Sequence, residues 1–134
     1  MSPRRSGVAI LGAAAAFALA GFLLVAAACV PQSSLPSDCD ASEVERSATL
    51  AGQQLDPSAI DVCRGQGVTL TVTTERDGVL HLHGYDDQGA AVEIHIGETA
   101  HLVFTASRPG QFPVEFHDAN GSSEEVGILT VHER

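Results

Sequence analysis

The chain has 134 residues, a length that suits one domain plus a targeting segment and excludes a large multi-domain enzyme. Its charge is strongly acidic, with 17 Asp and Glu against seven basic residues, all of them arginines. Arg4 and Arg5 lie near the start, so the part from Cys29 onward holds five arginines and all 17 acidic residues. This balance argues against binding nucleic acid or an anionic membrane surface through charge, and is compatible with a cationic partner such as a metal ion.

An apolar stretch over residues 8–30 is about long enough to cross a bilayer as a helix. Arg4 and Arg5 precede it and three alanines, residues 26–28, lie near its end, which is the pattern of a secretory signal peptide. The residues that flank the two arginines do not fit a twin-arginine signal, which favours an ordinary positive n-region. The pattern predicts a signal peptide over residues 1–28.

Small residues directly before Cys29 resemble a bacterial lipoprotein signal. The resemblance implies that Cys29 is lipidated and becomes the first residue of the mature chain, although Ala26 stands where Leu or Val is usual. An uncleaved membrane-anchor helix and a plain secretory signal are the alternatives. All three predict an exported protein, and the first places it on the extracytoplasmic face of the cell membrane, held by a lipid.

The other two cysteines, Cys39 and Cys63, are expected to form a disulfide, because exported domains meet an oxidising environment. The alternative is a pair of thiolate metal ligands. Such a pair would need further Cys or His at short spacing, and neither cysteine has such a neighbour.

Residues 29–40 read as a polar tether and residues 41–134 as one domain. Its first segment, residues 40–52, opens with the Asp-x-x-Glu form of a helix start and could align Val44, Ala48 and Leu50 on one apolar stripe. The segment therefore predicts a helix of two or three turns.

The rest of the domain alternates between apolar and polar residues, as half-buried β-strands do. Strands are expected at residues 68–74, 79–85, 101–106, 111–116 and 128–131, among roughly seven in all. Asp77-Gly78 predicts a hairpin turn between the first two. Short strands separated by Gly, Pro and Asp turns predict an all-β antiparallel sandwich with Greek-key connections.

Six histidines are the candidate functional residues. On a strand, His81 and His83 point to one face, so a single ion could meet both, although two histidines on the polar outer face of a sandwich would show the same pattern. His117 lies where a strand enters the polar loop 118–125. The remaining three are expected to be solvated surface residues: His95, His101 and His132.

The segments of the chain follow in the order of a strand, HLHGYD at residues 81–86, PGQFPVEFH at residues 109–117 and the closing strand 127–131. In this order of its segments the chain resembles a cupredoxin. The resemblance covers residues 62–131 and is to the bacterial exported cupredoxin-like domains of the HxHGYD type. It implies a cupredoxin-like Greek-key β-sandwich. In copper-carrying members, one ligand comes from the His81–His83 strand and the others, a Cys, a His and often a Met, come from the loop 116–126.

The chain departs from that pattern at the ligands. Phe116 stands where the ligand Cys belongs, and the only Met is Met1, so a blue-copper site cannot form. An imidazole site with carboxylates remains, suited to Cu(II) or Zn(II). The candidate ligands are the histidines His83, His117 and His81, with the carboxylates of Asp86, Asp118 and Glu115 as further donors.

We therefore expect a protein of the cell envelope that binds or handles copper or another divalent metal. The alternative is a metal-free accessory module that binds an envelope protein, in which Tyr85, Asp86 and the histidines form a hydrogen-bonded network. A distance between His83 and His117 above about 10 Å would favour the second, since both nitrogens must reach one ion. Catalysis is not expected, because the sequence has no nucleophile elbow, phosphate loop or zinc-protease motif.

Overall fold

The computed structural model describes residues 35–134, and the predicted signal peptide and Cys29 lie outside these residues. Within the described part, the elements are nine strands and one 3-10 helix, in the order β1 (Glu43–Ala51), β2 (Gln54–Asp56), β3 (Ala59–Cys63), β4 (Gly67–Thr74), β5 (Gly78–Leu82), η1 (Asp86–Gln88), β6 (Ala91–Ile94), β7 (Thr99–Thr105), β8 (Gly110–Asp118) and β9 (Ser123–His132). The prediction of an all-β domain is confirmed.

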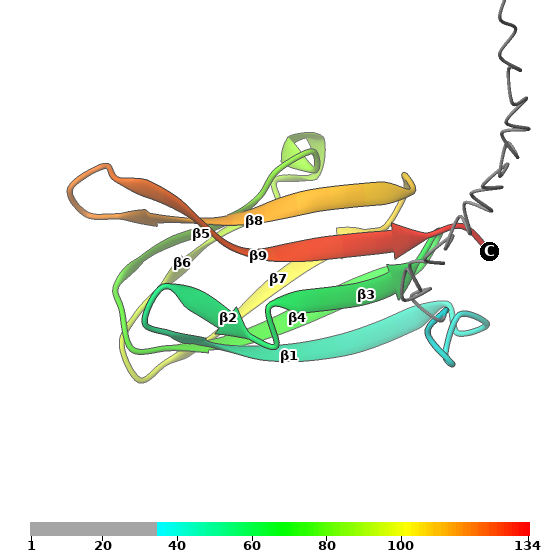
Figure 1. Cartoon of the computed structure of the whole chain (residues 1–134), viewed down its shortest axis with the longest axis horizontal. Coiled ribbons are helices and arrows are strands. Elements are labelled where there is room, and N and C mark those ends of the chain that lie inside the picture. The colour runs from blue at the N-terminus through cyan, green and yellow to red at the C-terminus, as the bar shows by residue number, and fades with distance from the viewer. Residues whose placement is uncertain (1–34) are drawn as a thin grey trace, which may run out of the picture. The chain divides into compact units, whose positions relative to one another are not determined.

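The strands form two sheets that face each other as a sandwich (Figure 1). One sheet has the order β2-β1-β4-β7 and the other the order β3-β9-β8-β5-β6. The prediction of a wholly antiparallel sandwich is wrong at two places, because β1 pairs with β4 and β3 pairs with β9 in parallel. Parallel partners need a crossover between them, which here carries the chain from one sheet to the other.

The helix predicted for residues 40–52 is wrong, because this segment is mainly the strand β1. Val44, Ala48 and Leu50 are buried on the inner face, and the two-residue period that they share is the period of a strand. Arg46 occupies the inward position between Val44 and Ala48, and this gap in the apolar pattern made the spacing look helical. Pairing with β4 over residues 43–50 supplies the hydrogen bonds that favour the strand.

The hairpin predicted at Asp77-Gly78 is also wrong. β4 and β5 flank this turn, yet they belong to different sheets. The turn therefore carries the chain across the sandwich, and β5 pairs instead with β8 and β6. The strand predicted to reach residue 85 ends at Leu82, where the chain enters the turn before η1.

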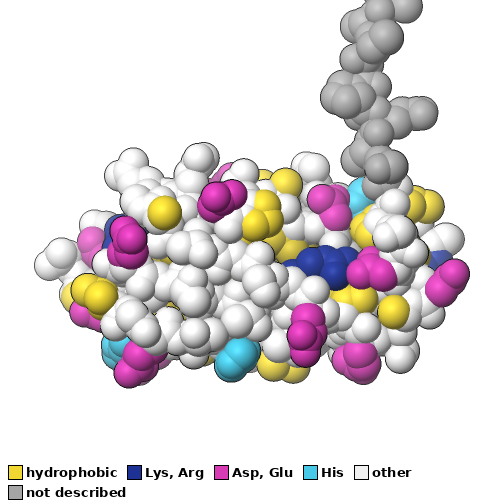
Figure 2. All heavy atoms as spheres, turned by 90° about the horizontal axis from the view of Figure 1, so that it is seen from below, with side chains coloured by type: hydrophobic (Ala, Val, Ile, Leu, Met, Phe, Trp, Pro, Cys, Tyr) yellow, Lys and Arg dark blue, Asp and Glu magenta, His cyan; other side chains and the backbone are white. Residues whose placement is uncertain are grey.

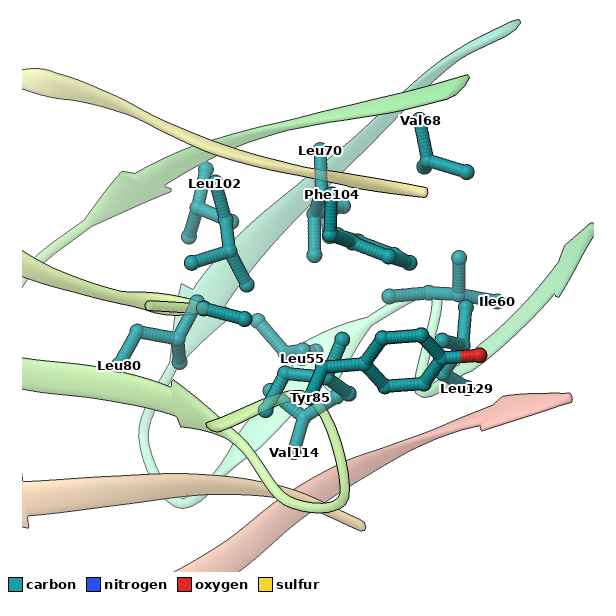
Figure 3. Packing of buried hydrophobic residues seen from close by; sticks show 14 of the residues in the cluster. Leu55, Ile60, Val68, Leu70, Leu80, Tyr85, Leu102, Phe104, Val114 and Leu129 are labelled. Atoms are coloured by element: carbon teal, nitrogen blue, oxygen red, sulfur yellow. The ribbon is translucent and has the colours of Figure 1, made fainter. Parts of the chain in front are cut away.

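The core lies between the two sheets. Figure 3 shows side chains from both meeting in one cluster, such as Leu70 and Leu102 from one sheet and Leu80 and Val114 from the other. Tyr85 is fully buried among them, with its ring centre 4.9 Å from that of Phe112. Its hydroxyl donates to the carbonyl oxygen of Arg108 at 3.1 Å, which satisfies the one polar atom that this side chain buries.

The predicted disulfide between Cys39 and Cys63 is present, with 5.3 Å between the two Cα atoms. The buried side chain of Gln66 supports it from the inside. This side chain accepts a hydrogen bond from the backbone N–H of Cys63 and donates to the carbonyl oxygens of Asp38 and Ala41. Residues 38–41, which precede β1, are therefore fastened to the sandwich. Among the described residues, no helix is long and apolar enough to span a membrane.

Candidate metal site on the outer face of the five-stranded sheet

Four candidate residues come together on the outer face of the five-stranded sheet. β5 and β8 are antiparallel neighbours, and their register places His81 opposite Glu115 and Val79 opposite His117. Leu80, Leu82, Val114 and Phe116 alternate with these residues and are buried in the core. The alternation therefore turns His81, Glu115 and His117 outward together, and His83 follows directly after the end of β5.

Glu115 is the centre of this group. Its Oε2 atom lies 2.8 Å from Nε2 of His83 and 3.5 Å from Nε2 of His117. The hydroxyl of Ser123, on β9, donates to the same oxygen at 3.0 Å. The contact with His83 is the largest of the effects that hold the pKa of Glu115 below its ordinary value, so this carboxyl group is an anionic oxygen donor at neutral pH.

His81 lies beside the other two imidazoles. Its ring centre is 4.7 Å from that of His83 and 5.8 Å from that of His117. The Nε2 atom of His81 lies 2.7 Å from Oδ1 of Asp86. This contact is the main cause of a lowered pKa of Asp86. The expectation that His81 and His83 stand side by side on one face is confirmed.

His117 supplies the most direct sign of an incomplete site. Its Nε2 atom is buried, yet it has no hydrogen-bond partner among the described residues. A buried imidazole nitrogen without a partner costs free energy, and a metal ion would satisfy it.

His81, Glu115 and His117 offer one donor atom each, and these atoms all lie within 4.8 Å of one another. Two imidazole nitrogens and one carboxylate oxygen suit Cu(II) or Zn(II), and the residues present therefore fit such an ion.

The predicted candidates divide into those inside the group and those beside it. His83 and His117 contact the same oxygen of Glu115, so they satisfy the proximity that the metal hypothesis requires. Asp86 contacts the group through His81. Asp118 instead accepts hydrogen bonds at 2.9 Å from the backbone N–H groups of Asn120 and Ser122. These bonds lower its pKa and shape the turn between β8 and β9.

Sequence reasoning missed the central place of Glu115 and the contact of Ser123 with it. One signal for Glu115 was available: Glu115 and His117 repeat on β8 the two-residue spacing of His81 and His83, which puts two donors on one face. The contact with Ser123 depends on the pairing of β8 with β9 around a bulge at Val114 and Glu115, which local sequence does not show.

The remaining histidines differ from one another. His95 and His101 are exposed, as predicted. His132 was predicted to be a solvated surface residue, and this is wrong: its side chain is 11% exposed and its Nε2 lies 2.7 Å from Oδ1 of Asp61. The parallel pairing of β3 with β9 puts His132 opposite Cys63, from where its side chain reaches Asp61 two residues earlier on β3.

The surface around the group is acidic and open. Figure 2 shows the opposite side of the molecule, the outer face of the four-stranded sheet, where acidic side chains are also scattered with few basic ones among them. A hollow of about 240 Å³ borders the group, and His117, Val79 and His95 lie on its wall with the carboxylates of Asp77, Glu93 and Asp118. This arrangement attracts cations to the hollow beside His117.

No protein-family model matches the chain, and no curated protein sequence matches it. Solved structures do match. The solution structure of a copper-binding protein in its apo form has a TM-score of 0.55 at 13% identity, covering 69% of this chain and 90% of that one. The metal-binding domain of the Cu(I)-exporting P-type ATPase CopA of Streptococcus pneumoniae D39, solved with Cu(I), has a TM-score of 0.52 at 19% identity, covering 75% and 92%.

The blue copper oxidase of Nitrosomonas europaea also matches, with a TM-score of 0.53 at 20% identity over 69% of this chain and 39% of that protein. Structural similarity at such low sequence identity indicates a shared fold and no more than that. The two sheets and these neighbours together show that the described domain is a cupredoxin-like β-sandwich.

Proposed function

We propose that this protein binds copper as Cu(II) through His81, Glu115 and His117, with His83 beside them. One observation carries the proposal: His81, Glu115 and His117 offer metal-ligating atoms that lie within 4.8 Å of one another, and Nε2 of His117 is buried and forms no hydrogen bond with the described residues. The carboxylates of Asp77, Glu93 and Asp118 in the hollow beside His117 support it, because they raise the local concentration of cations.

Copper is the first metal to test, because two structures with this fold are of copper-binding proteins. They are an apo copper-binding protein and the metal-binding domain of a Cu(I)-exporting CopA. The oxidation state follows from the donors. Cu(I) prefers soft thiolate and thioether ligands. Cys39 and Cys63 are joined in a disulfide, and the described residues include no methionine, so the site offers imidazole and carboxylate, which suit Cu(II). Zn(II) would accept the same donors and is the competing ion.

The proposed site differs from a blue-copper centre. Phe116, which stands where the family's ligand Cys belongs, is 1% exposed and lies in the core, on the opposite face of β8 from Glu115 and His117. The proposed role is to bind or pass on the metal, without catalysis and without the thiolate chemistry of electron carriers.

Removing both ligand imidazoles is expected to abolish the site. In the full-length chain carrying Cys29→Ser, the variant His81→Ala/His117→Ala should lose at least about 100-fold in Cu(II) affinity, because a single carboxylate and one imidazole remain. Equilibrium dialysis followed by metal analysis measures this. The matched control is His101→Ala, which removes an exposed imidazole of the four-stranded sheet and should bind as the parent does.

Equal affinity in all three proteins would contradict the proposal. It would favour the metal-free interaction module, for which there is a specific observation: His81 and His83 already contact carboxylates, Asp86 and Glu115. Tyr85 takes no part in that network, because its hydroxyl donates a hydrogen bond to the carbonyl oxygen of Arg108.

The proposal includes export and attachment to the outer face of the cell membrane through a lipid on Cys29. Its support is the apolar segment and the three alanines before Cys29. Cells that express the chain should incorporate a fatty-acid probe into the wild type and not into Cys29→Ser. A matched control, Cys39→Ser/Cys63→Ser, should be labelled as the wild type is, and labelling of Cys29→Ser would contradict the lipid anchor.

A further inference from the structure

The contact between His81 and Asp86 decides which nitrogen of His81 can bind a metal. An imidazole has two nitrogens, and here Nε2 lies 2.7 Å from Oδ1 of Asp86. A carboxylate accepts a hydrogen bond, so this geometry makes Nε2 the protonated nitrogen. The nitrogen left with a free lone pair is Nδ1 of His81.

Asp86 is itself held in place. Its other oxygen, Oδ2, accepts a hydrogen bond from the backbone N–H of Gly84 at 3.2 Å. Gly84 has a φ of +82°, and a Cβ atom there would lie 2.7 Å from the ring of Phe112, so only glycine suits this turn. The next residue, Tyr85, is fully buried and fastens the turn to the core. Asp86 therefore stands on a fixed turn directly beside the end of β5.

We infer that Asp86 is a positioning residue of the proposed metal site. It holds His81 with Nε2–H toward itself and thereby leaves Nδ1 as the nitrogen through which His81 would bind an ion together with Glu115 and His117. A carboxylate behind a ligating histidine fixes the ring and makes the ligating nitrogen more basic. The inference rests on the proposed function, and it assigns Asp86 a role behind a ligand in place of the direct ligation expected from sequence.

The same turn gives each residue of the His83–Asp86 segment a separate task. His83 contacts Glu115, Gly84 permits the turn, Tyr85 fastens it to the core and Asp86 orients His81. The segment therefore supports the site by positioning side chains around it, while the proposed ligands lie on the neighbouring strands β5 and β8.

The orientation can be tested without any metal. Long-range ¹H–¹⁵N correlation spectra of the metal-free chain, at a pH where the spectra show a neutral ring, should report the Nε2–H form of His81. In Asp86→Ala the two tautomers should mix. An Nδ1–H form in the wild type, or an unchanged tautomer in Asp86→Ala, would overturn the inference.

The metal arm uses Cu(II) itself and three variants in the Cys29→Ser chain. Asp86→Ala should lower the Cu(II) affinity about 10- to 100-fold, and Asp86→Asn, whose amide oxygen still accepts from Nε2–H, should restore much of it. Asp87→Ala is the matched control, because the ion pair of this neighbouring carboxylate is with Arg108, at 3.7 Å. Its affinity should equal that of the parent.

The outcomes separate the two claims. Normal binding by the parent with unchanged affinity in Asp86→Ala would overturn the role of Asp86 and leave the proposed function standing. Absence of binding by the parent would overturn the proposed function and the metal role of Asp86 together. A loss in Asp86→Ala that Asp86→Asn does not reduce would indicate direct ligation, and would also overturn the inference.

Discussion

Replacing Cys39 and Cys63 together by serine is expected to lower the free energy of unfolding by about 3 to 4 kcal/mol. The disulfide closes a chain segment with a sequence separation of 24 residues, which limits the unfolded chain. It also joins residues 38–41 to the end of β3, so its loss would free the segment that Gln66 binds.

Urea unfolding of the purified chain, followed by circular dichroism, measures this change. The matched control is Cys29→Ser, which removes the cysteine outside the described domain and should unfold at the urea concentration of the wild type. A loss below about 1 kcal/mol in the double variant would show that the crosslink contributes little to the native state.

Replacing Phe116 by cysteine is expected to cost about 3 kcal/mol and to create no blue copper site. Phe116 is buried against Gly78, and the guanidinium group of Arg76 lies 4.2 Å from the centre of its ring. A smaller side chain would leave a cavity and remove this contact. The new thiol would lie inside the sandwich, whereas His81 and His117 lie outside it.

Visible absorption of the Cu(II)-loaded variant, combined with urea unfolding, checks both parts. Phe116→Leu is the control for stability, since it keeps more of the buried volume and should lose less. An intense absorption band at the red end of the spectrum of Phe116→Cys would contradict the placement of this residue, because such a band arises when a thiolate binds copper.

The fold was predictable where local pattern and tertiary pairing agree. β4 alternates without interruption over Val68, Leu70 and Val72, and such a pattern permits only a half-buried strand. The segment of β1 was ambiguous, because Arg46 interrupts its apolar positions. Its conformation is decided by pairing with β4, some 24 residues away in sequence, which no local signal contains.

The site was predictable only where local spacing decides which residues share a face. The two-residue spacing of His81 and His83 shows that they share a face, and this needs no knowledge of the neighbouring strand. The register that puts Glu115 opposite His81 is a long-range property of β5 and β8. The role of Asp86 depends on the φ of Gly84 and the burial of Tyr85, so sequence identified the residue without its task.

The electron paramagnetic resonance spectrum of the full-length Cys29→Ser chain with one equivalent of Cu(II) tests the central claim most directly. Two imidazoles and a carboxylate predict a tetragonal Cu(II) signal with nitrogen coupling from His81 and His117, in a sample that stays nearly colourless. The same signal should vanish in His81→Ala/His117→Ala. A spectrum of free aqueous Cu(II) in the parent chain, or a nitrogen-coupled signal that survives in the double variant, would contradict the claim that these residues form a copper site.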